Sequence, residues 1–206
     1  MATGKYHRDL AEKKRGHIIG AARRLFIERG FEDMTMTDVA EAANVSAMTL
    51  YKHFPSKDDL LGVILDEMSE QLHLVLSAPI DRNAPPRQAL EDYVRRFCAL
   101  ISDDDVIESI RRVIAIAPKF PTQAKRFREQ TTSMLHDRLA NYFDELIAKG
   151  VIRSHRSTDS VGQLLGYLLN SLMFAQLLDR HKHENPALAE EISEFAINTF
   201  FKAYGT

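Results

Sequence analysis

The segment from Thr35 to Lys57 constrains the fold of this chain more than any other, because it predicts two short helices joined by a tight turn. Thr35 and Asp38 have the spacing of a capping box, which begins a helix by satisfying its free amide groups. Asn44 tolerates the left-handed backbone of a tight turn, and Ser46 can cap the helix that follows. The pattern therefore predicts helix, turn and helix within one short stretch.

The second short helix is expected to present polar side chains to solvent. Leu50 and Phe54 lie four residues apart, so both can face the core, and Pro55 ends the helix because the residue before a proline avoids helical geometry. Met48 and Lys52 fall on the opposite face of the helix. A short helix held by two apolar anchors in this way is typical of a surface that reads another molecule.

The run from Gly30 to Leu61, GFEDMTMTDVAEAANVSAMTLYKHFPSKDDLL, resembles the helix-turn-helix signature of the TetR family of bacterial transcriptional regulators. The matching positions are Thr35, Ala40, Val45, Ser46, Thr49, Leu50, Tyr51, His53, Phe54, Ser56 and Lys57. Asn44 stands where the family usually has glycine. Ala47 and Met48 stand where it often has Lys-Gly, so one usual DNA contact is absent.

The resemblance implies a head that binds double-stranded DNA. From the face opposite the two apolar anchors, we expect Met48, Thr49 and Lys52 to read bases. The resemblance further implies contacts to the DNA backbone by Tyr51, by Lys57 and by the hydroxyls of two threonines. The full set of predicted DNA-binding residues is Thr35, Thr37, Ser46, Ala47, Met48, Thr49, Tyr51, Lys52, His53 and Lys57.

The distribution of charge agrees with a DNA-binding head, although the whole chain has a net charge of −2. Residues 1–57 hold 10 Lys and Arg against 7 Asp and Glu, a net of +3, and the remainder holds 17 against 22, a net of −5. A basic head on an acidic body suits a DNA reader with a separate body, although a chance uneven composition would look the same.

The N-terminal segment is expected to form a basic arm before the first helix, with Lys5, Arg8, Lys13, Lys14 and Arg15 against two acids. Such an arm can follow phosphates or enter a minor groove, or it can simply be solvated. The first helix follows, with Ile18, Ile19, Ala22, Leu25 and Phe26 on one stripe, and Gly30 is expected to end it. The segment lacks the apolar core of a signal peptide, and the single cysteine suits a reducing cytosol, so we expect a cytoplasmic protein.

The remaining chain predicts helices throughout and no alternating strand. The expected fold is all-α with about nine helices, in which a three-helix head over residues 1–57 precedes a helical ligand-binding and dimerisation body over residues 58–206. The body helices are expected near residues 57–77, 86–101, 103–117, 121–149, 161–178 and 188–204. The stretch RRVIAIAPKFPTQAKRFREQ resembles the C-terminal domain of the AefR-like subset of the family.

Residues 161–178 form an uncharged stretch of eighteen residues, which is a marginal length for a membrane span. Its glutamines, asparagine and two glycines favour a buried helix packed on its own core and on a partner subunit, without a membrane. In TetR-like proteins the last two helices form a four-helix interface between two copies, so we expect a homodimer. The predicted interface residues are Leu165, Gly166, Leu168, Leu172, Ile192, Phe195 and Thr199.

An apolar stripe on each of two body helices predicts a ligand pocket. Arg138 points with the aromatic side chains of its helix. It can be a cationic anchor for a small molecule, or an arginine that extends to water or pairs with an acid. The predicted pocket residues are Phe97, Cys98, Ile101, Phe127, Thr131, Met134, Arg138 and Tyr142. We expect an apolar or aromatic effector, with an anionic or carbonyl group favoured by the guanidinium.

The sequence contains no pattern for catalysis, a metal or a cofactor. His181 and His183 form no recognised metal site, and Cys98 on an apolar face is expected to be a small buried hydrophobe. The prediction is therefore a ligand-responsive DNA-binding regulator, a repressor released from a near-palindromic operator, and not an enzyme. Two alternatives stay open: a regulator whose body contacts a protein instead of a small molecule, and a helical carrier with a vestigial head.

Overall fold

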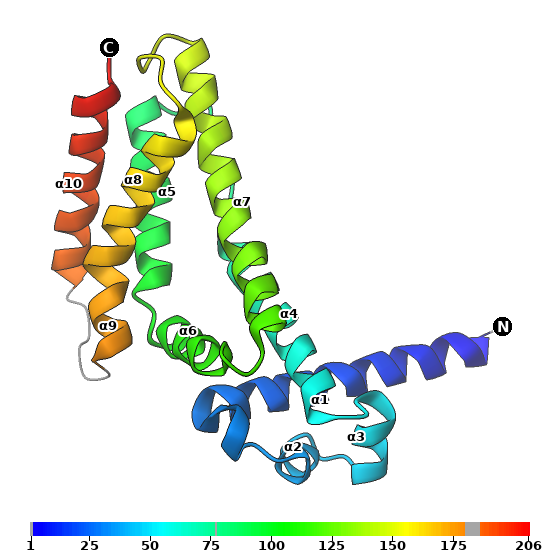
Figure 1. Cartoon of the computed structure of the whole chain (residues 1–206). Coiled ribbons are helices and arrows are strands. Elements are labelled where there is room, and N and C mark those ends of the chain that lie inside the picture. Colours follow the sequence, from blue (N-terminus) through cyan, green and yellow to red (C-terminus); the bar gives the residue numbers. More distant parts are fainter. Residues whose placement is uncertain (1, 77, 180–185) are drawn as a thin grey trace. The chain divides into compact units, whose positions relative to one another are not determined.

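The computed structural model describes the backbone of residues 2–76, 78–179 and 186–206, and the side chains of residues 10–74, 78–179 and 187–206. The described residues form helices and no named strand, apart from an isolated bridge between Ile152 and Gly205 (Figure 1). The elements are α1 (Ala2–Asp33), α2 (Met36–Ala42), α3 (Ala47–His53), α4 (Lys57–Leu76), α5 (Pro86–Ile101), α6 (Asp104–Ile116), α7 (Pro121–Ala148), α8 (Ser157–Leu168), η1 (Leu169–Phe174), α9 (Ala175–Leu178) and α10 (Pro186–Tyr204). Because α8, η1 and α9 are continuous, the described part of the chain holds nine helices, which confirms the predicted fold class.

The chain divides into two compact units. The head unit contains residues 1–70 together with residues 112–127, and the body unit contains residues 71–111 and 128–206. The head unit therefore extends past the boundary expected near residue 57, and it includes a segment distant in sequence that no local pattern indicated.

The head unit is built around α1, α2, α3 and the first turns of α4. Ile18, Phe26, Leu50 and Ile64 are completely buried in it. The predicted helix signals are present: Thr35 and Asp38 form a capping box, Asn44 has a φ of 53°, and Ser46 accepts a hydrogen bond from the Thr49 amide at 3.2 Å. The local chemistry of the segment thus produces the expected helix, turn and helix.

The start of α1 corrects the expected basic arm. The helix begins at Ala2, so the basic residues occupy its first turns and do not form a separate segment before it. Gly30 ends the regular helix as predicted, with a φ of 84°. The ring of Phe31, the residue after Gly30, packs edge-on against Phe120, with 4.8 Å between the ring centroids.

Residues 112–127 fasten the C-terminal end of α1. The Arg112 guanidinium donates to the backbone carbonyls of Ile27 and Glu28, each at 2.9 Å. The last carbonyls of a helix have no amide donor within the helix, so a side chain such as this one can satisfy them. Lys119 pairs with Glu32 at 2.8 Å. An arginine at the carbonyl end of a helix also interacts favourably with the helix dipole. These contacts explain why residues 112–127 belong to the head unit.

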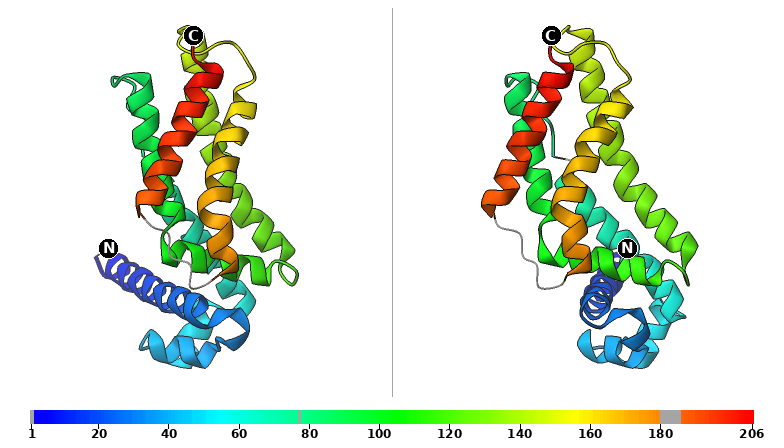
Figure 2. Two further views of the ribbon diagram at one scale, coloured as in Figure 1. Left: turned by 90° about the vertical axis from the view of Figure 1, so that its left-hand side faces the viewer. Right: turned by 60° about the vertical axis from the view of Figure 1, so that its left-hand side comes forward.

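The body unit has one apolar core, formed by α5, α7, α8 and α10 and the segment around Ile80. Leu90, Leu139, Phe143 and Leu168 are completely buried in it. Figure 2 shows α8, η1 and α9 lying beside α10 in both views, and α10 also packs on α5. The packed helices of this core hold the outward-facing residues of the body unit in fixed positions, from which they can bind other molecules.

The helix from Ser157 to Leu178 is long and apolar enough to cross a membrane by length and composition alone, with a mean hydropathy of 1.3. In this structure one side of it belongs to the body core. Its backbone passes through a π-helical segment, Leu169–Phe174, that the sequence pattern did not predict. Near its C-terminal end, Gln176 is buried and its side-chain amide donates to the Leu172 carbonyl at 2.7 Å. A core helix of a soluble protein passes the same test of length and composition.

Candidate functional site

The outer face of α3 is the most exposed part of the predicted DNA-binding surface. Leu50 and Phe54 are buried and anchor the helix in the head, while Met48 is 84% exposed and Tyr51 is 52% exposed. Lys52 is exposed on the same side. The predicted division into an inner and an outer face is therefore present, and the outer face makes a short ridge of one apolar, one aromatic and one basic side chain.

Two of the predicted contact residues already use their hydroxyls inside the head. The Thr35 hydroxyl donates to the Asp38 carboxylate at 2.6 Å and accepts from the Asp38 amide. The Thr35 hydroxyl, together with the Thr35 backbone amide that donates to the same carboxylate at 2.9 Å, holds the pKa of Asp38 below its ordinary value. The Thr49 hydroxyl lies 2.9 Å from that of Ser46, which caps α3. A DNA contact by either threonine would have to share the hydroxyl with the cap, whereas Thr37 is exposed.

Lys57 also has a structural task. Its ammonium donates to the Glu32 carbonyl at 3.2 Å and lies 4.4 Å from the centre of the Phe31 ring. A substitution at this position would therefore disturb the end of α1 as well as any phosphate contact. The other predicted residues of this surface are placed as expected around α3: Ser46 and Ala47 are exposed at its start, and His53 is half-buried in its last turn.

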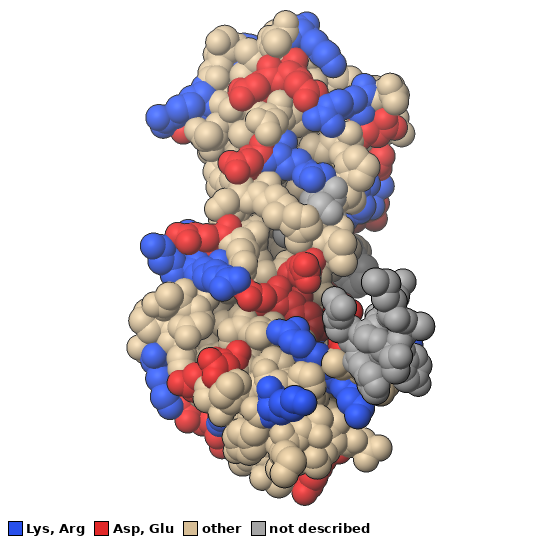
Figure 3. Space-filling view, turned by 90° about the vertical axis from the view of Figure 1, so that its right-hand side faces the viewer, with Lys and Arg blue, Asp and Glu red and all other residues tan. Residues whose placement is uncertain are grey.

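Charge on the head is distributed over separate side chains. On the face drawn in Figure 3, Lys and Arg alternate with Asp and Glu and do not gather into one basic field. On that face (Figure 3) the described positive charges therefore stand as individually placed residues. Position relative to α3 decides which of them can meet DNA.

The predicted dimer residues separate into two groups, which corrects the expected interface. Leu165, Leu168, Leu172 and Ile192 are buried in the core of the body unit and cannot form a contact surface. Because the helix from Ser157 to Leu178 is apolar nearly all round, its sequence does not show which side faces the core of the body unit. Gly166, Phe195 and Thr199 are exposed, and the sequence missed the exposed Tyr167, Phe174 and Leu178.

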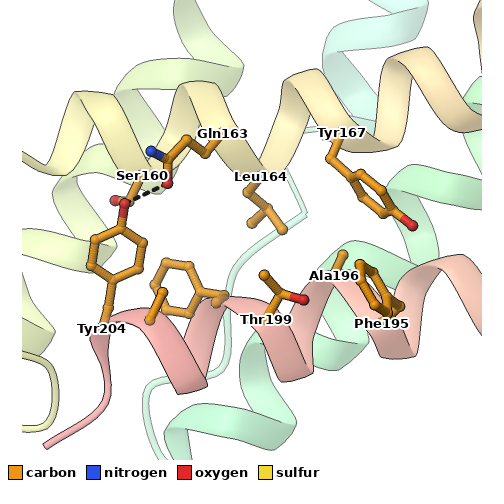
Figure 4. Close-up of a pocket in the computed structure, with 10 residues that line it drawn as sticks. Ser160, Gln163, Leu164, Tyr167, Phe195, Ala196, Thr199 and Tyr204 are labelled. Carbon is orange, nitrogen blue, oxygen red and sulfur yellow. Dashed lines mark hydrogen bonds between the residues drawn. The ribbon is translucent and has the colours of Figure 1, made fainter.

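Tyr167, Phe195 and Thr199 of the exposed group line a shallow groove between α8 and α10, with a cavity of about 120 Å³ (Figure 4). The Tyr167 and Phe195 rings lie against each other across it, 5.5 Å apart. At one end of the groove the Tyr204 hydroxyl donates to Gln163. Apart from the backbone of its own helix, a β-carbon added at Gly166 would meet no atom within 4 Å, so this part of the helix is open.

The structure does not bring the predicted ligand residues together. Phe97, Ile101 and Tyr142 are buried side chains of the body core, as is Cys98, whose Sγ accepts from Ser193. Apolar stripes at helical spacing face the core of a helical unit. Half of the predicted ligand residues therefore serve core packing. Phe127 belongs to the head unit, and Thr131 is half-buried one turn further along α7.

Met134 and Arg138 line a cavity of about 600 Å³ beside the segment at Ile80. The Arg138 guanidinium donates to the Ala78 carbonyl at 3.1 Å, so part of its binding capacity serves the backbone. Sequence reasoning missed Tyr93, which is almost completely buried and whose hydroxyl has no hydrogen-bond partner among the described residues. Burial raises the pKa of Tyr93 to about 12, against the opposing effect of the Arg138 and Arg96 charges. The group is therefore a neutral hydroxyl that can donate a hydrogen bond.

The described residues contain no group of three His, Cys, Asp or Glu side chains that could hold a metal ion. His181 and His183 lie outside the described residues. Burial raises the pKa of the Cys98 thiol, which reduces its reactivity.

Two family models match this chain. Residues 18–64 match the N-terminal model of the bacterial regulatory proteins of the tetR family, and residues 88–206 match the C-terminal domain of the AefR-like transcriptional repressors. The second match alone covers more than half of the chain. Both agree with the resemblance found in the helix-turn-helix segment.

Curated relatives and solved structures give the same assignment. The transcriptional repressor DhaR of Mycobacterium sp. is 32% identical over 92 residues, which are 44% of this chain and 45% of DhaR. The regulator TtgR of Pseudomonas putida is 38% identical over 128 residues, 62% of this chain and 61% of TtgR. These alignments span less than two thirds of either relative.

Among solved structures, a TetR-family regulator from Mesorhizobium loti has a TM-score of 0.83 at 25% identity, over 95% of this chain and 98% of that one. The flavonoid-responsive regulator FrrA has a TM-score of 0.78 at 26% identity, over 94% and 98% of the two chains. The fold, the helix-turn-helix geometry and both family matches agree: this chain is no enzyme and belongs to the TetR family of bacterial transcriptional regulators.

Proposed function

We propose that this chain acts in the cytoplasm as a homodimer, and that each subunit places α3 in the major groove of one half of a near-palindromic operator. A helix fits the major groove, and two-fold symmetric dimers bind half-sites about 34–36 Å apart or multiples of that spacing. The observation that carries the proposal is the outer face of α3. Met48 and Tyr51 are exposed, although Leu50 between them is completely buried.

The proposal assigns different roles to the residues of this face. Met48 and Lys52 lie where base edges would be, because they project from the middle of the exposed side, and Tyr51 is suited to a phosphate. Replacing Lys52 by glutamine should change which bases are preferred at one position, at a cost of about 1–3 kcal/mol for the original sequence. Replacing Tyr51 by phenylalanine should weaken binding to all duplexes alike.

Both variants can be compared with the wild type by fluorescence anisotropy on a panel of duplexes with single base changes. Thr37→Ala is measured alongside these variants to test the predicted backbone contact by a threonine hydroxyl. Thr37 is exposed, and its hydroxyl, unlike that of Thr35, is not part of the helix cap. If Lys52→Gln and Tyr51→Phe both retain the affinity and the base preference of the wild type, α3 is not the reading helix.

The proposed dimer uses the exposed group on α8, η1, α9 and α10. Phe174 and Phe195 are each 57% exposed and Leu178 is 76% exposed. Large apolar residues gathered on one face of a monomer indicate an interaction surface. Light scattering should give a mass near twice the 23.4 kDa of one chain at micromolar concentration. A mass equal to one chain would contradict the dimer.

The proposed regulation is release from DNA by a small apolar or aromatic effector that prefers a different conformation of the body. Tyr93 and Arg138 support a ligand with a carbonyl or anionic group, because the buried Tyr93 hydroxyl and the half-buried Arg138 guanidinium can both donate hydrogen bonds. The relative FrrA is called flavonoid-responsive, which favours aromatic compounds bearing oxygen. A screen of such compounds for release of labelled operator tests this, and a reporter gene would distinguish repression from activation.

A further inference from the structure

A cavity of about 630 Å³ lies between α5 and α10 in the body unit, and the proposed function makes no use of it. It shares no lining residue with either of the two cavities described above. Its apolar lining includes the buried side chains of Cys98 and Ile197 and the small side chains of Ala99 and Ala189. Small-molecule sites have volumes in this range and mostly apolar walls, so the cavity is large enough to hold a ligand.

The cavity lies on the side of α10 away from the proposed dimer face. Ser193 and Ile197, one turn apart, line the cavity. Phe195 lies two residues from each of them, which is a rotation of about 200° around the helix, so it projects from the opposite side. A dimer formed through Phe195 would therefore leave the cavity open to small molecules.

The two arginines that line the cavity already have partners. Arg87 pairs with Glu91 at 2.8 Å and also donates to Asn198 on α10. Arg95 pairs with Asp92 at 3.2 Å. Because each guanidinium already has a carboxylate beside it, the cavity offers an anionic ligand no unpaired positive charge from these two side chains.

α10 contributes two carboxylates to the cavity, Glu190 and Glu194, which are exposed and lie one turn apart. Neither forms an ion pair with any residue that the structure describes. Like charges four residues apart destabilise a helix, so this pair needs a cation nearby. Counting Asp92, two arginines face four carboxylates here, which leaves an excess of two negative charges.

Two serine hydroxyls of the lining can accept hydrogen bonds. The Ser193 hydroxyl donates to the Ala189 carbonyl at 2.7 Å and lies 3.1 Å from the Cys98 Sγ, so its oxygen lone pairs remain available. The Ser102 hydroxyl oxygen is buried and has no hydrogen-bond partner in the described part of the chain. An ammonium group only donates hydrogen bonds, and carboxylate and hydroxyl oxygens can accept them.

We propose that the cavity between α5 and α10 is a second small-molecule site, and that it binds an aliphatic polyamine. One ammonium group meets Glu190 and another meets Glu194, which are about 6 Å apart along the helix axis. The methylene chain between the ammonium groups covers the apolar lining at Ile197. The site is independent of the proposed binding of DNA and of the effector cavity beside Arg138.

The test measures binding of spermine to the purified full chain by isothermal titration calorimetry at a fixed salt concentration. Glu190→Gln and Glu194→Gln each remove one charge from the cavity. Glu191→Gln is the matched control, because this glutamate is exposed on α10 and does not line the cavity. Asp137→Asn removes a carboxylate from the cavity beside Arg138. Butylamine and succinate serve as a single cation and a dianion.

Spermine should bind the wild type saturably at one site per chain, more tightly than butylamine, and succinate should not bind. Glu190→Gln and Glu194→Gln should each weaken spermine binding about threefold to tenfold, and the double variant should weaken it further. Glu191→Gln and Asp137→Asn should bind it as the wild type does. Because a ligand of the folded state stabilises that state, spermine should also raise the melting temperature of the wild type more than that of the double variant.

A second variant, Ala99→Phe, tests the cavity by volume and leaves every charge in place. Ala99 is exposed on α5, so the larger ring can enter the cavity without disturbing the core, and spermine binding should be lost. Circular dichroism checks that each variant is folded. If Ala99→Phe does not fold, the comparison of the glutamine variants decides alone.

The proposal is overturned if the wild type shows no saturable binding of spermine. It is also overturned if Glu191→Gln weakens binding as much as Glu194→Gln, because the attraction would then come from general acidity of the surface. Loss of binding in Asp137→Asn alone would place spermine in the other cavity, and unchanged binding in a folded Ala99→Phe would place it outside this one.

Discussion

Replacing each of two glycines of α1 by alanine, which adds one methyl group, should change the free energy of unfolding in opposite directions. Gly30 has a φ of 84° and a ψ of 171°, a backbone conformation that is almost restricted to glycine and costs another residue about 1–3 kcal/mol. Gly20 lies in the regular part of the same helix, and a β-carbon there would meet no atom within 4 Å. Gly20→Ala is therefore the matched control for Gly30→Ala.

The contacts around Gly30 add to the cost of the change. Its β-carbon would lie 3.1 Å from a guanidinium nitrogen of Arg112, the side chain that donates to the carbonyls of Ile27 and Glu28. A hydrogen bond to a charged group contributes about 1.5–3 kcal/mol, and less where water can replace it, as at this partly exposed helix end. With the backbone term, we expect Gly30→Ala to lower the free energy of unfolding by about 2–4 kcal/mol.

Gly20→Ala should raise the free energy of unfolding by about 0.5–1 kcal/mol, because alanine loses less backbone entropy than glycine in a helix. Equilibrium urea denaturation followed by circular dichroism measures both changes. If Gly30→Ala is as stable as Gly20→Ala, the end of α1 is not held in the described conformation, and the assignment of Arg112 to the head unit loses its support.

Three other predictions concern the body and the helix cap. Phe195→Asp should convert the dimer to a monomer with its fold retained, whereas Leu168→Ala should cost about 2–5 kcal/mol of stability through a core cavity; light scattering and denaturation separate the two effects. The lowered pKa of Asp38 means that the Thr35 cap contributes stability at neutral pH and loses it as the pH falls below about 4. Asp38→Asn should therefore flatten the acid limb of the stability curve, and an unchanged limb would remove the cap from the explanation. Tyr93→Phe should leave stability equal or slightly higher without ligand, because it removes a buried hydroxyl with no partner among the described residues, and should raise the effector concentration needed for DNA release at least several-fold. Equal potency in both proteins would place the effector elsewhere.

Local chemistry explains which parts of the head could be predicted from the sequence. Thr35, Asn44 and Ser46 act on residues no more than a few positions away, so their spacing indicates the caps and the turn directly. The register of Leu50 and Phe54 similarly determines which face of α3 is exposed. Family resemblance rested on these same positions.

The features that the sequence did not reveal depend on distant partners. Arg112 reaches the end of α1 across more than eighty residues of chain, and an arginine in a helix gives no sign of such a contact. The face of Leu165 and Leu168 could not be assigned, because their helix is apolar nearly all round and only its neighbours decide which side is inward. The helical arm was missed for the converse reason, since it has no apolar stripe to indicate a helix.

The central claim, that paired α3 helices recognise a specific DNA sequence, is tested most directly by selecting bound duplexes from random DNA with the purified protein at a fixed salt concentration. The account predicts enrichment of one inverted repeat, with half-site centres one helical turn of about 10–10.5 base pairs apart or a multiple of it. Enrichment of no sequence, or of a single site without an inverted partner, would contradict it.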